Sequence, residues 1–195
     1  MQKQRSFSEY RNIDLVLFAV MLAVSETLIV NASVRWFPME AYTVSVVGAI
    51  TSIVMMRWGF WAGMHAFFGG IVYCFASGAG PRHYIVYCVG NLFSLIAMAM
   101  VKLLGKEAIR DSAAKSVIFA LIVTVLMQLG RGLTSMLFGS DVLDAFGFVT
   151  TDALSLVFSA VIVWIARRLD GIFEDQKHYL LRLKEAERKE KGGTQ

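Results

Sequence analysis

Residues 15–34 read LVLFAVMLAVSETLIVNASV, and this stretch decides the class of the protein. A bilayer core about 30 Å thick is crossed by about 20 residues of helix, and this run contains a single ionisable residue, Glu26. Similar apolar runs recur along the chain. The sequence therefore predicts an all-α membrane protein, a bundle of six transmembrane helices with a short second span, at Leu15–Val34, Ala41–Met56, Gly59–Ala76, Tyr84–Val101, Ser116–Phe138 and Phe148–Ala166.

Charged residues are concentrated at the two ends of the chain. Residues 1–13 and 167–195 hold 18 of the 34 charged residues, and 16 are spread over residues 14–166. With 56% hydrophobic residues and a mean hydropathy of +0.58, the composition excludes a disordered chain and an ordinary soluble enzyme. We expect a cytoplasmic N-terminal segment at 1–13, a membrane domain at 14–168 and a cytoplasmic helical tail at 169–195.

The distribution of Lys and Arg predicts the orientation. Six spans place 16 of the 19 basic residues on the side of the termini and leave Arg35, Arg82 and Arg131 near the other side. Short loops rich in Lys and Arg stay in the cytoplasm, so both termini are predicted to be cytoplasmic, in a multi-pass protein of the plasma membrane. The basic residues flank apolar runs, which does not indicate a nucleic-acid partner.

Two further features complete the outline of the chain. Residues 170–191 combine mixed charges with partly helical apolar spacing, which predicts a helix that extends the sixth span. Cys74 and Cys88 lie inside apolar runs, which indicates buried free thiols rather than a disulfide framework.

Polar residues inside the predicted spans are the candidate site. An ionisable or strongly polar group in a span is costly unless it faces a polar interior, so each is a functional candidate. Under the predicted topology they lie in the outer half of the bilayer and, with nearby aromatic residues, outline a basin that opens outward. The candidate substrate-binding residues are Glu26, Asn31, Arg35, Trp36, Tyr42, Arg82, Tyr84, Tyr87, Asn91, Gln128, Arg131 and Asp152.

Structural roles compete with these assignments. Glu26 and Arg131 lie at similar depth and could form an ion pair that holds two spans together. Asp152 could cap the sixth helix, and Asn91 could be an interhelical hydrogen-bonding residue. Trp36, Tyr42 and Tyr84 could belong to an interfacial aromatic belt. His65, deep in the third span, is interpreted as a core histidine.

The sequence carries no enzymatic motif. It has no phosphate loop with lysine, no His-Glu-x-x-His pair and no Gly-x-Ser-x-Gly elbow. We expect a non-enzymatic protein without cofactor or metal, which needs a partner to use the energy of ATP.

Small residues recur in the first and third spans. Ala19 and Ala23 are four residues apart in the predicted cytoplasmic half of the first span, where they allow another helix to approach closely. Residues 47–70 are punctuated by glycine, with the run Gly59-Phe60-Trp61-Ala62-Gly63 and then Gly69-Gly70. With six spans and internal termini, this combination resembles the S-components, the membrane-embedded substrate-binding subunits of energy-coupling factor (ECF) vitamin transporters, over about residues 12–170.

The resemblance implies a division of labour. An S-component captures a vitamin or related micronutrient outside the cell. It then docks, through residues that match Ala19 and Ala23 here, onto a transmembrane scaffold subunit driven by two cytoplasmic ATPases. The three outer arginines, opposed by Glu26 and Glu40, suggest a water-soluble ligand with at least one anionic group and a hydrogen-bonding or cationic part. Folate-, pantothenate- and cobalamin-like compounds are all compatible.

Two other functions stay open at this point. A self-sufficient small transporter or channel would use Glu26 or Arg131 as a relay, and it would need polar residues that continue through the inner half. A ligand-free accessory membrane protein would have polar groups that pair only with one another.

Overall fold

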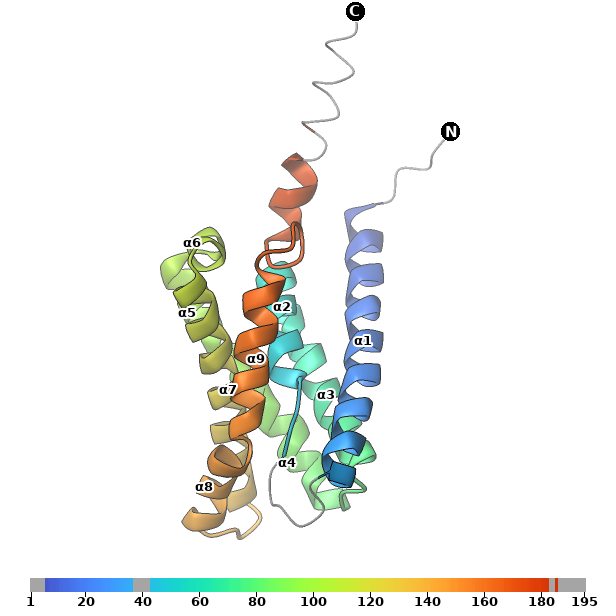
Figure 1. Cartoon of the computed structure of the whole chain (residues 1–195), viewed down its shortest axis with the longest axis vertical. Helices are drawn as coiled ribbons and strands as arrows, with labels where there is room; N and C mark the ends of the chain where they lie inside the picture. The colour runs from blue at the N-terminus through green and yellow to red at the C-terminus, as the bar shows by residue number, and fades with distance from the viewer. Residues whose placement is uncertain (1–5, 37–42, 183–184, 186–195) are drawn as a thin grey trace, which may run out of the picture.

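The computed structural model describes residues 6–36, 43–182 and 185, and this part of the chain is helical without any strand. The prediction of an all-α fold is confirmed. The helices run side by side along the long axis of the molecule (Figure 1). One end, here called the α6 end, carries the start of α1, α6 and the helix at 176–182, and the opposite end, the α8 end, carries α8 and the turn between α3 and α4 (Figure 1).

Eleven helical elements are assigned within residues 7–166, and a further helix covers 176–182. In chain order they are α1 Phe7–Trp36, α2 Val47–Trp58, η1 Gly59–Trp61, α3 Ala62–Ala76, α4 Pro81–Asn91, η2 Leu92–Ala97, α5 Met98–Leu104, α6 Lys106–Asp111, α7 Ala113–Met136, α8 Val142–Thr151 and α9 Ala153–Ala166.

Several of these helices are compatible with a bilayer. In the described residues, four helical stretches are long and apolar enough to cross it, namely Phe7–Trp36, Val47–Ala76, Pro81–Leu104 and Ala113–Met136. A fifth is reached if Ala145–Thr151 and Ala153–Ala166, bent by 50°, form one broken span. The chain therefore has the helices of a membrane protein, with four or five candidate spans by this criterion where the sequence predicted six.

The difference from six arises at the second and third predicted spans. Val47–Ala76 is continuous in sequence, but Gly59 has φ +63°, a conformation that glycine adopts without strain, and the chain reverses there. Gly69 of α3 packs directly on Val47 of α2, since a Cβ built on Gly69 would lie 2.5 Å from Cγ1 of Val47. The two helices thus form an antiparallel hairpin whose arms, of 12 and 15 residues, are about 18 and 22 Å long.

Helix α7 is the central element of the bundle. It packs against α2, α4, η2, α6, α8 and α9, whereas α1 packs mainly on α3 and α2. The tightest approach joins α4 and α7, where a Cβ on Gly130 would lie 2.2 Å from the carbonyl oxygen of Gly90. This contact requires glycine because backbone lies on one side and the ring of Phe93 on the other.

Gly130→Ala is therefore expected to destabilise the protein by about 1 to 3 kcal/mol, because the added methyl group forces α4 and α7 apart. The measurement is detergent-solubilised unfolding in a denaturant titration. Gly147→Ala is the matched control, since its Cβ would meet open space and a helical alanine is slightly favoured over glycine. Equal unfolding midpoints for the two variants would contradict the packing argument.

A buried ion pair closes the α6 end. Arg57 donates from Nε and Nη2 to the two carboxylate oxygens of Asp14, at 2.8 and 2.7 Å, and Trp58 Nε1 donates to the same carboxylate. Arg57 also donates to the carbonyl oxygens of Gly171 and Ile172. The sequence analysis counts Arg57 among the 16 basic residues on the predicted cytoplasmic side, and in the structure this side chain joins α1, α2 and the chain after α9.

The segment after α9 differs from the predicted continuous helix. Residues 167–175 form turns, with φ +72° at Gly171, and the following helix at 176–182 rises at the α6 end (Figure 1). Glu174 accepts from Arg110 and Arg182, and Lys106 donates to Asp175 at 2.5 Å. The tail is held by ion pairs to another part of the protein, which local periodicity does not reveal.

Candidate functional site

Arg131 is the centre of a buried polar cluster near the α8 end. Its Nε donates to Asn91 Oδ1 at 2.8 Å, and its Nη1 donates to Asp152 Oδ2 at 2.9 Å. The side chains of Arg131 and Asp152 are each 4% exposed, so this ion pair lies away from water. The guanidinium carbon also lies 4.5 Å from the centre of the Tyr87 ring, in a cation–π arrangement.

Asp152 links several elements to this cluster. Its Oδ1 accepts from the hydroxyl groups of Thr43, at 3.1 Å, and Ser155. Gln128 Nε2 donates to the backbone carbonyl of Asp152 at 3.2 Å. Asp152 occupies the N-cap position of α9, but its side chain accepts no capping N–H, so the capping alternative is wrong.

Glu26 reaches the same region from α1. It is fully buried, and its Oε2 accepts the backbone N–H of Val46 at 2.8 Å. Its other oxygen, Oε1, has no hydrogen-bond partner among the described residues, and the same holds for Gln128 Oε1. The ion pair that the sequence offered between Glu26 and Arg131 is wrong, because Arg131 pairs with Asp152.

Two tyrosines form an aromatic wall beside Arg131. Tyr73 and Tyr87 stack with ring centres 4.5 Å apart and an interplanar angle of 13°. Phe148 meets Tyr87 edge-on at 6.0 Å. The wall joins α3, α4 and α8, and the Tyr87 ring lies between Tyr73 and the Arg131 cation.

Backbone geometry explains why these side chains meet. The glycine contact between Gly90 and Gly130 brings α4 and α7 close, so the next residues along each helix, Asn91 and Arg131, become neighbours. The bend between α8 and α9 falls at Asp152 and turns its carboxylate toward α7. The extended residues 43–46 run between α1 and α9, where the N–H of Ser45 donates to the hydroxyl of Ser155 at 2.8 Å.

Six of the twelve predicted site residues lie in this cluster, which is made of Glu26, Tyr87, Asn91, Gln128, Arg131 and Asp152. Their assignment to a ligand stays a prediction. The cluster is closed in this conformation, since each of these side chains is buried. The sequence predicted a basin that opens outward, whereas these six residues form a packed and closed polar core.

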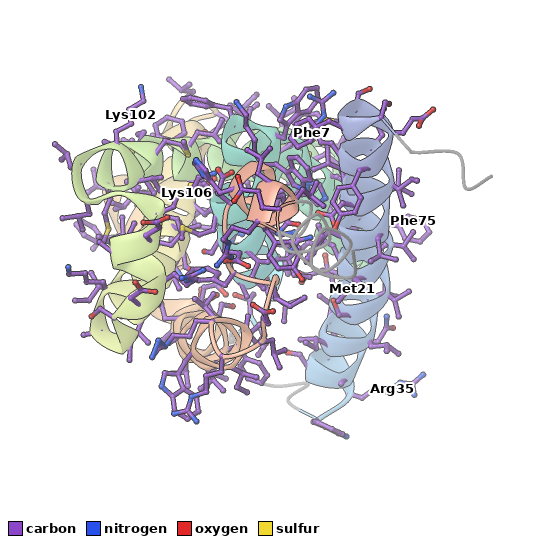
Figure 2. All side chains as sticks on the ribbon, turned by 90° about the horizontal axis from the view of Figure 1, so that it is seen from above. Phe7, Met21, Arg35, Phe75, Lys102 and Lys106 are labelled. Atoms are coloured by element: carbon purple, nitrogen blue, oxygen red, sulfur yellow. The ribbon has the colours of Figure 1, made fainter. Side chains whose placement is uncertain are left out.

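The other predicted residues lie elsewhere. Asn31 and Arg35 are exposed, Trp36 is 76% exposed, and Arg35 points away from the bundle (Figure 2). Arg82 donates to Ser140 Oγ at 2.8 Å and to the Ser135 carbonyl at 3.3 Å.

Tyr84 packs at the edge of the aromatic wall, and Tyr42 lies outside the described residues. The three outer arginines, Arg35, Arg82 and Arg131, do not converge on one anion site, because Arg131 is the only one of them in the buried cluster.

Sequence reasoning missed the neutral members of the cluster. Thr43 and Ser155 donate to Asp152, Ser45 donates to Ser155, and Tyr73 stacks on Tyr87. Hydroxyl groups are common in apolar helices and gave no signal alone. The position of Ser155, three residues after Asp152 on the same helical face, was a usable hint.

The remaining interpretations concern residues outside the cluster. His65 is buried, with Nε2 3.0 Å from the Leu15 carbonyl, which confirms a core histidine. Cys74 and Cys88 are buried free thiols, as predicted. Ala19 and Ala23 lie partly exposed at the edge of the buried stripe of α1.

The cluster suits some ligand chemistries better than others. Arg131 is already paired, whereas two buried oxygen atoms, Glu26 Oε1 and Gln128 Oε1, lack a donor among the described residues. An unsatisfied buried acceptor costs free energy, so a ligand that offers N–H or O–H groups to these oxygens would gain affinity. Within residues 6–36, 43–182 and 185, no group of three or more His, Cys, Asp and Glu side chains could hold a metal ion.

Comparison of the chain with protein-family models, with curated proteins and with solved structures found no match.

Proposed function

We propose that this protein is the substrate-binding S-component of an ECF-type importer. It captures a small water-soluble, vitamin-like ligand outside the cell and delivers it through a membrane scaffold subunit that two cytoplasmic ATPases drive. The observation that carries the proposal is the buried polar cluster around Arg131, in which Glu26 Oε1 and Gln128 Oε1 lack donors among the described residues. A polar core with vacant acceptors in an apolar bundle is costly, and ligand recognition accounts for it.

The proposed topology has six spans and cytoplasmic termini in the plasma membrane. The antiparallel α2–α3 hairpin supplies the second and third spans, with arms too short to cross an undeformed bilayer alone. The basic α6 end faces the cytoplasm, in keeping with the distribution of Lys and Arg. The cluster then lies in the outer half, since Arg131 is five residues from the end of α7 at Met136.

The described contacts also favour a second candidate, a ligand-free accessory protein. Arg131, Asn91 and Asp152 satisfy one another, as a purely structural polar core would. A self-sufficient transporter or channel that uses Glu26 and Arg131 has weaker support, because Arg131 is held in an ion pair. A ligand-binding experiment separates the S-component from both alternatives.

Ligand binding is expected to depend on Gln128. A panel of water-soluble vitamins is screened for a rise in the unfolding temperature of the purified protein, and the affinity of the positive compound is measured by calorimetry. At 100 times Kd a ligand stabilises the folded state by about 2.7 kcal/mol. Gln128→Met is expected to weaken binding about tenfold, since one buried hydrogen bond to the ligand contributes about 1 to 2 kcal/mol.

Thr134→Val is the matched control, because it removes a buried hydroxyl of the same helix that bonds only to the Gly130 carbonyl. Equal losses of affinity in the two variants would place the ligand outside the cluster. A panel without any stabilising compound would support the accessory protein.

A further inference from the structure

We propose that the α6 end holds a specific site for an anionic phospholipid, with the phosphate in a pocket of arginines and an acyl chain in a groove between α1 and α9. The proposal depends on the chain lying in a membrane and is independent of the proposed import function. Two hollows, one strongly basic and one apolar, carry it.

The basic hollow has a volume of about 260 Å³ and contains four arginines, Arg110, Arg167, Arg168 and Arg182, against Asp170 and Glu174. Its formal charge is thus +2, from four positive and two negative groups. Arg110 and Arg182 both pair with Glu174, which occupies them.

The side chains of Arg167 and Arg168 form no ion pair in the described part of the chain. Arg167 donates from Nη1 to the Arg110 carbonyl at 3.1 Å, while its buried Nε has no partner among the described residues. Arg168 is exposed. A phosphate group would receive charged hydrogen bonds from these two side chains.

The basic hollow lies directly after the end of α9, at the depth expected for lipid headgroups. Arg168 stacks over the Trp164 ring at 3.9 Å, and tryptophan prefers the interface between headgroups and hydrocarbon. Two half-exposed apolar residues of α9, Val161 and Ile165, precede Arg168 in the chain. The surface therefore changes from apolar along the last two turns of α9 to basic directly after the helix ends, as lipid-facing surfaces do at the membrane boundary.

The apolar hollow is a groove of about 590 Å³ between α1 and α9, with α2 as its floor. Its lining includes Phe18 and Met21 of α1, Ile53 of α2, and Val161 of α9. Ser25 is the one polar side chain in it, and its hydroxyl donates to carbonyls of its own helix, at Met21 and Leu22. Met21, one of the lining residues, is labelled on α1 in Figure 2.

One side chain, that of Arg57, contacts residues of both hollows. Arg57 stacks on Phe18, which lines the groove, and donates to the carbonyl of Gly171, which lines the basic hollow. Val161 lies five residues before the end of α9 at Ala166, about 8 Å along the helix, and Arg168 follows two residues after that end. Phosphate and upper acyl chain of one phospholipid span such a distance, and the positive charge selects an anionic lipid.

The test is lipid retention measured by native mass spectrometry on the delipidated protein in detergent. Phosphatidylglycerol and phosphatidylcholine with identical acyl chains are titrated, and phosphatidylglycerol is expected to bind more tightly. Arg168→Gln should weaken phosphatidylglycerol binding about fivefold, the contribution of about one basic residue at an anionic lipid surface. Lys115→Gln, an exposed charge at the same end outside the hollow, should leave it within about twofold.

The groove is tested separately. Val161→Trp should weaken both lipids by filling the groove, while Val20→Trp on the exposed side of α1 should not. Equal affinity of the wild-type protein for the two lipids would overturn the proposal. Competition by inorganic phosphate gives a second test. The proposal would also be overturned if phosphate displaced phosphatidylglycerol better than chloride at equal ionic strength while Val161→Trp left lipid binding unchanged. That result would assign the basic hollow to soluble phosphate compounds.

Discussion

Arg131→Met is expected to lower the free energy of unfolding by about 3 to 5 kcal/mol, because it leaves the buried carboxylate of Asp152 without its cationic partner. Asp152 is 3% exposed, so water cannot replace the guanidinium. The hydroxyl groups of Thr43 and Ser155 remain as donors, but they are neutral. The measurement is unfolding in mixed detergent micelles with increasing denaturing detergent, followed by circular dichroism.

A double variant separates the ion pair from simple packing. Arg131→Met combined with Asp152→Leu removes both charges and should recover most of the loss, since apolar replacement of a buried ion pair is often close to neutral. Asn91 keeps its donation to the Ala66 carbonyl in both variants. A loss below about 1 kcal/mol in Arg131→Met would contradict the buried cluster and indicate that water reaches Asp152.

Ala19→Trp is expected to reduce ligand uptake to background while ligand binding stays unchanged. Ala19 lies at the partly exposed edge of α1, where the large indole would block close approach of a scaffold helix without entering the core. The measurement is uptake of labelled ligand by cells that also produce the scaffold subunit and the two ATPases, beside calorimetric binding to the purified variant.

Leu133→Trp is the matched control, because it adds an indole to an exposed apolar position of α7. Its uptake should equal that of the wild-type protein. Normal uptake by Ala19→Trp would remove the docking role from this part of α1, and lost binding would show that the substitution disturbs the fold instead.

The sequence by itself determined the all-helical class of the protein and the burial of several polar side chains. Hydrophobic runs near the length of a bilayer crossing, with few charges, predict membrane helices from local composition, and the described residues are helical throughout the bundle. Burial of Glu26, Asn91 and Gln128 followed from the same rule, since polar groups in apolar helices turn inward.

Tertiary structure decided which polar groups meet. Glu26 and Asp152 are both acidic residues that could form an ion pair with Arg131. The bend before α9 and the glycine contact between α4 and α7 bring Asp152 to Arg131. Helix rotation, offset and bending depend on contacts between residues far apart in sequence, which local patterns do not encode.

The same contrast holds at the α6 end. The sequence determined that this end is rich in charge, because Lys, Arg, Asp and Glu are excluded from the apolar runs. Only the folded chain decided that Arg57 is buried against Asp14 and that Glu174 and Asp175 form ion pairs with α6. An ion pair forms where two distant segments are held within about 4 Å, and that distance is a property of the packed bundle rather than of either segment.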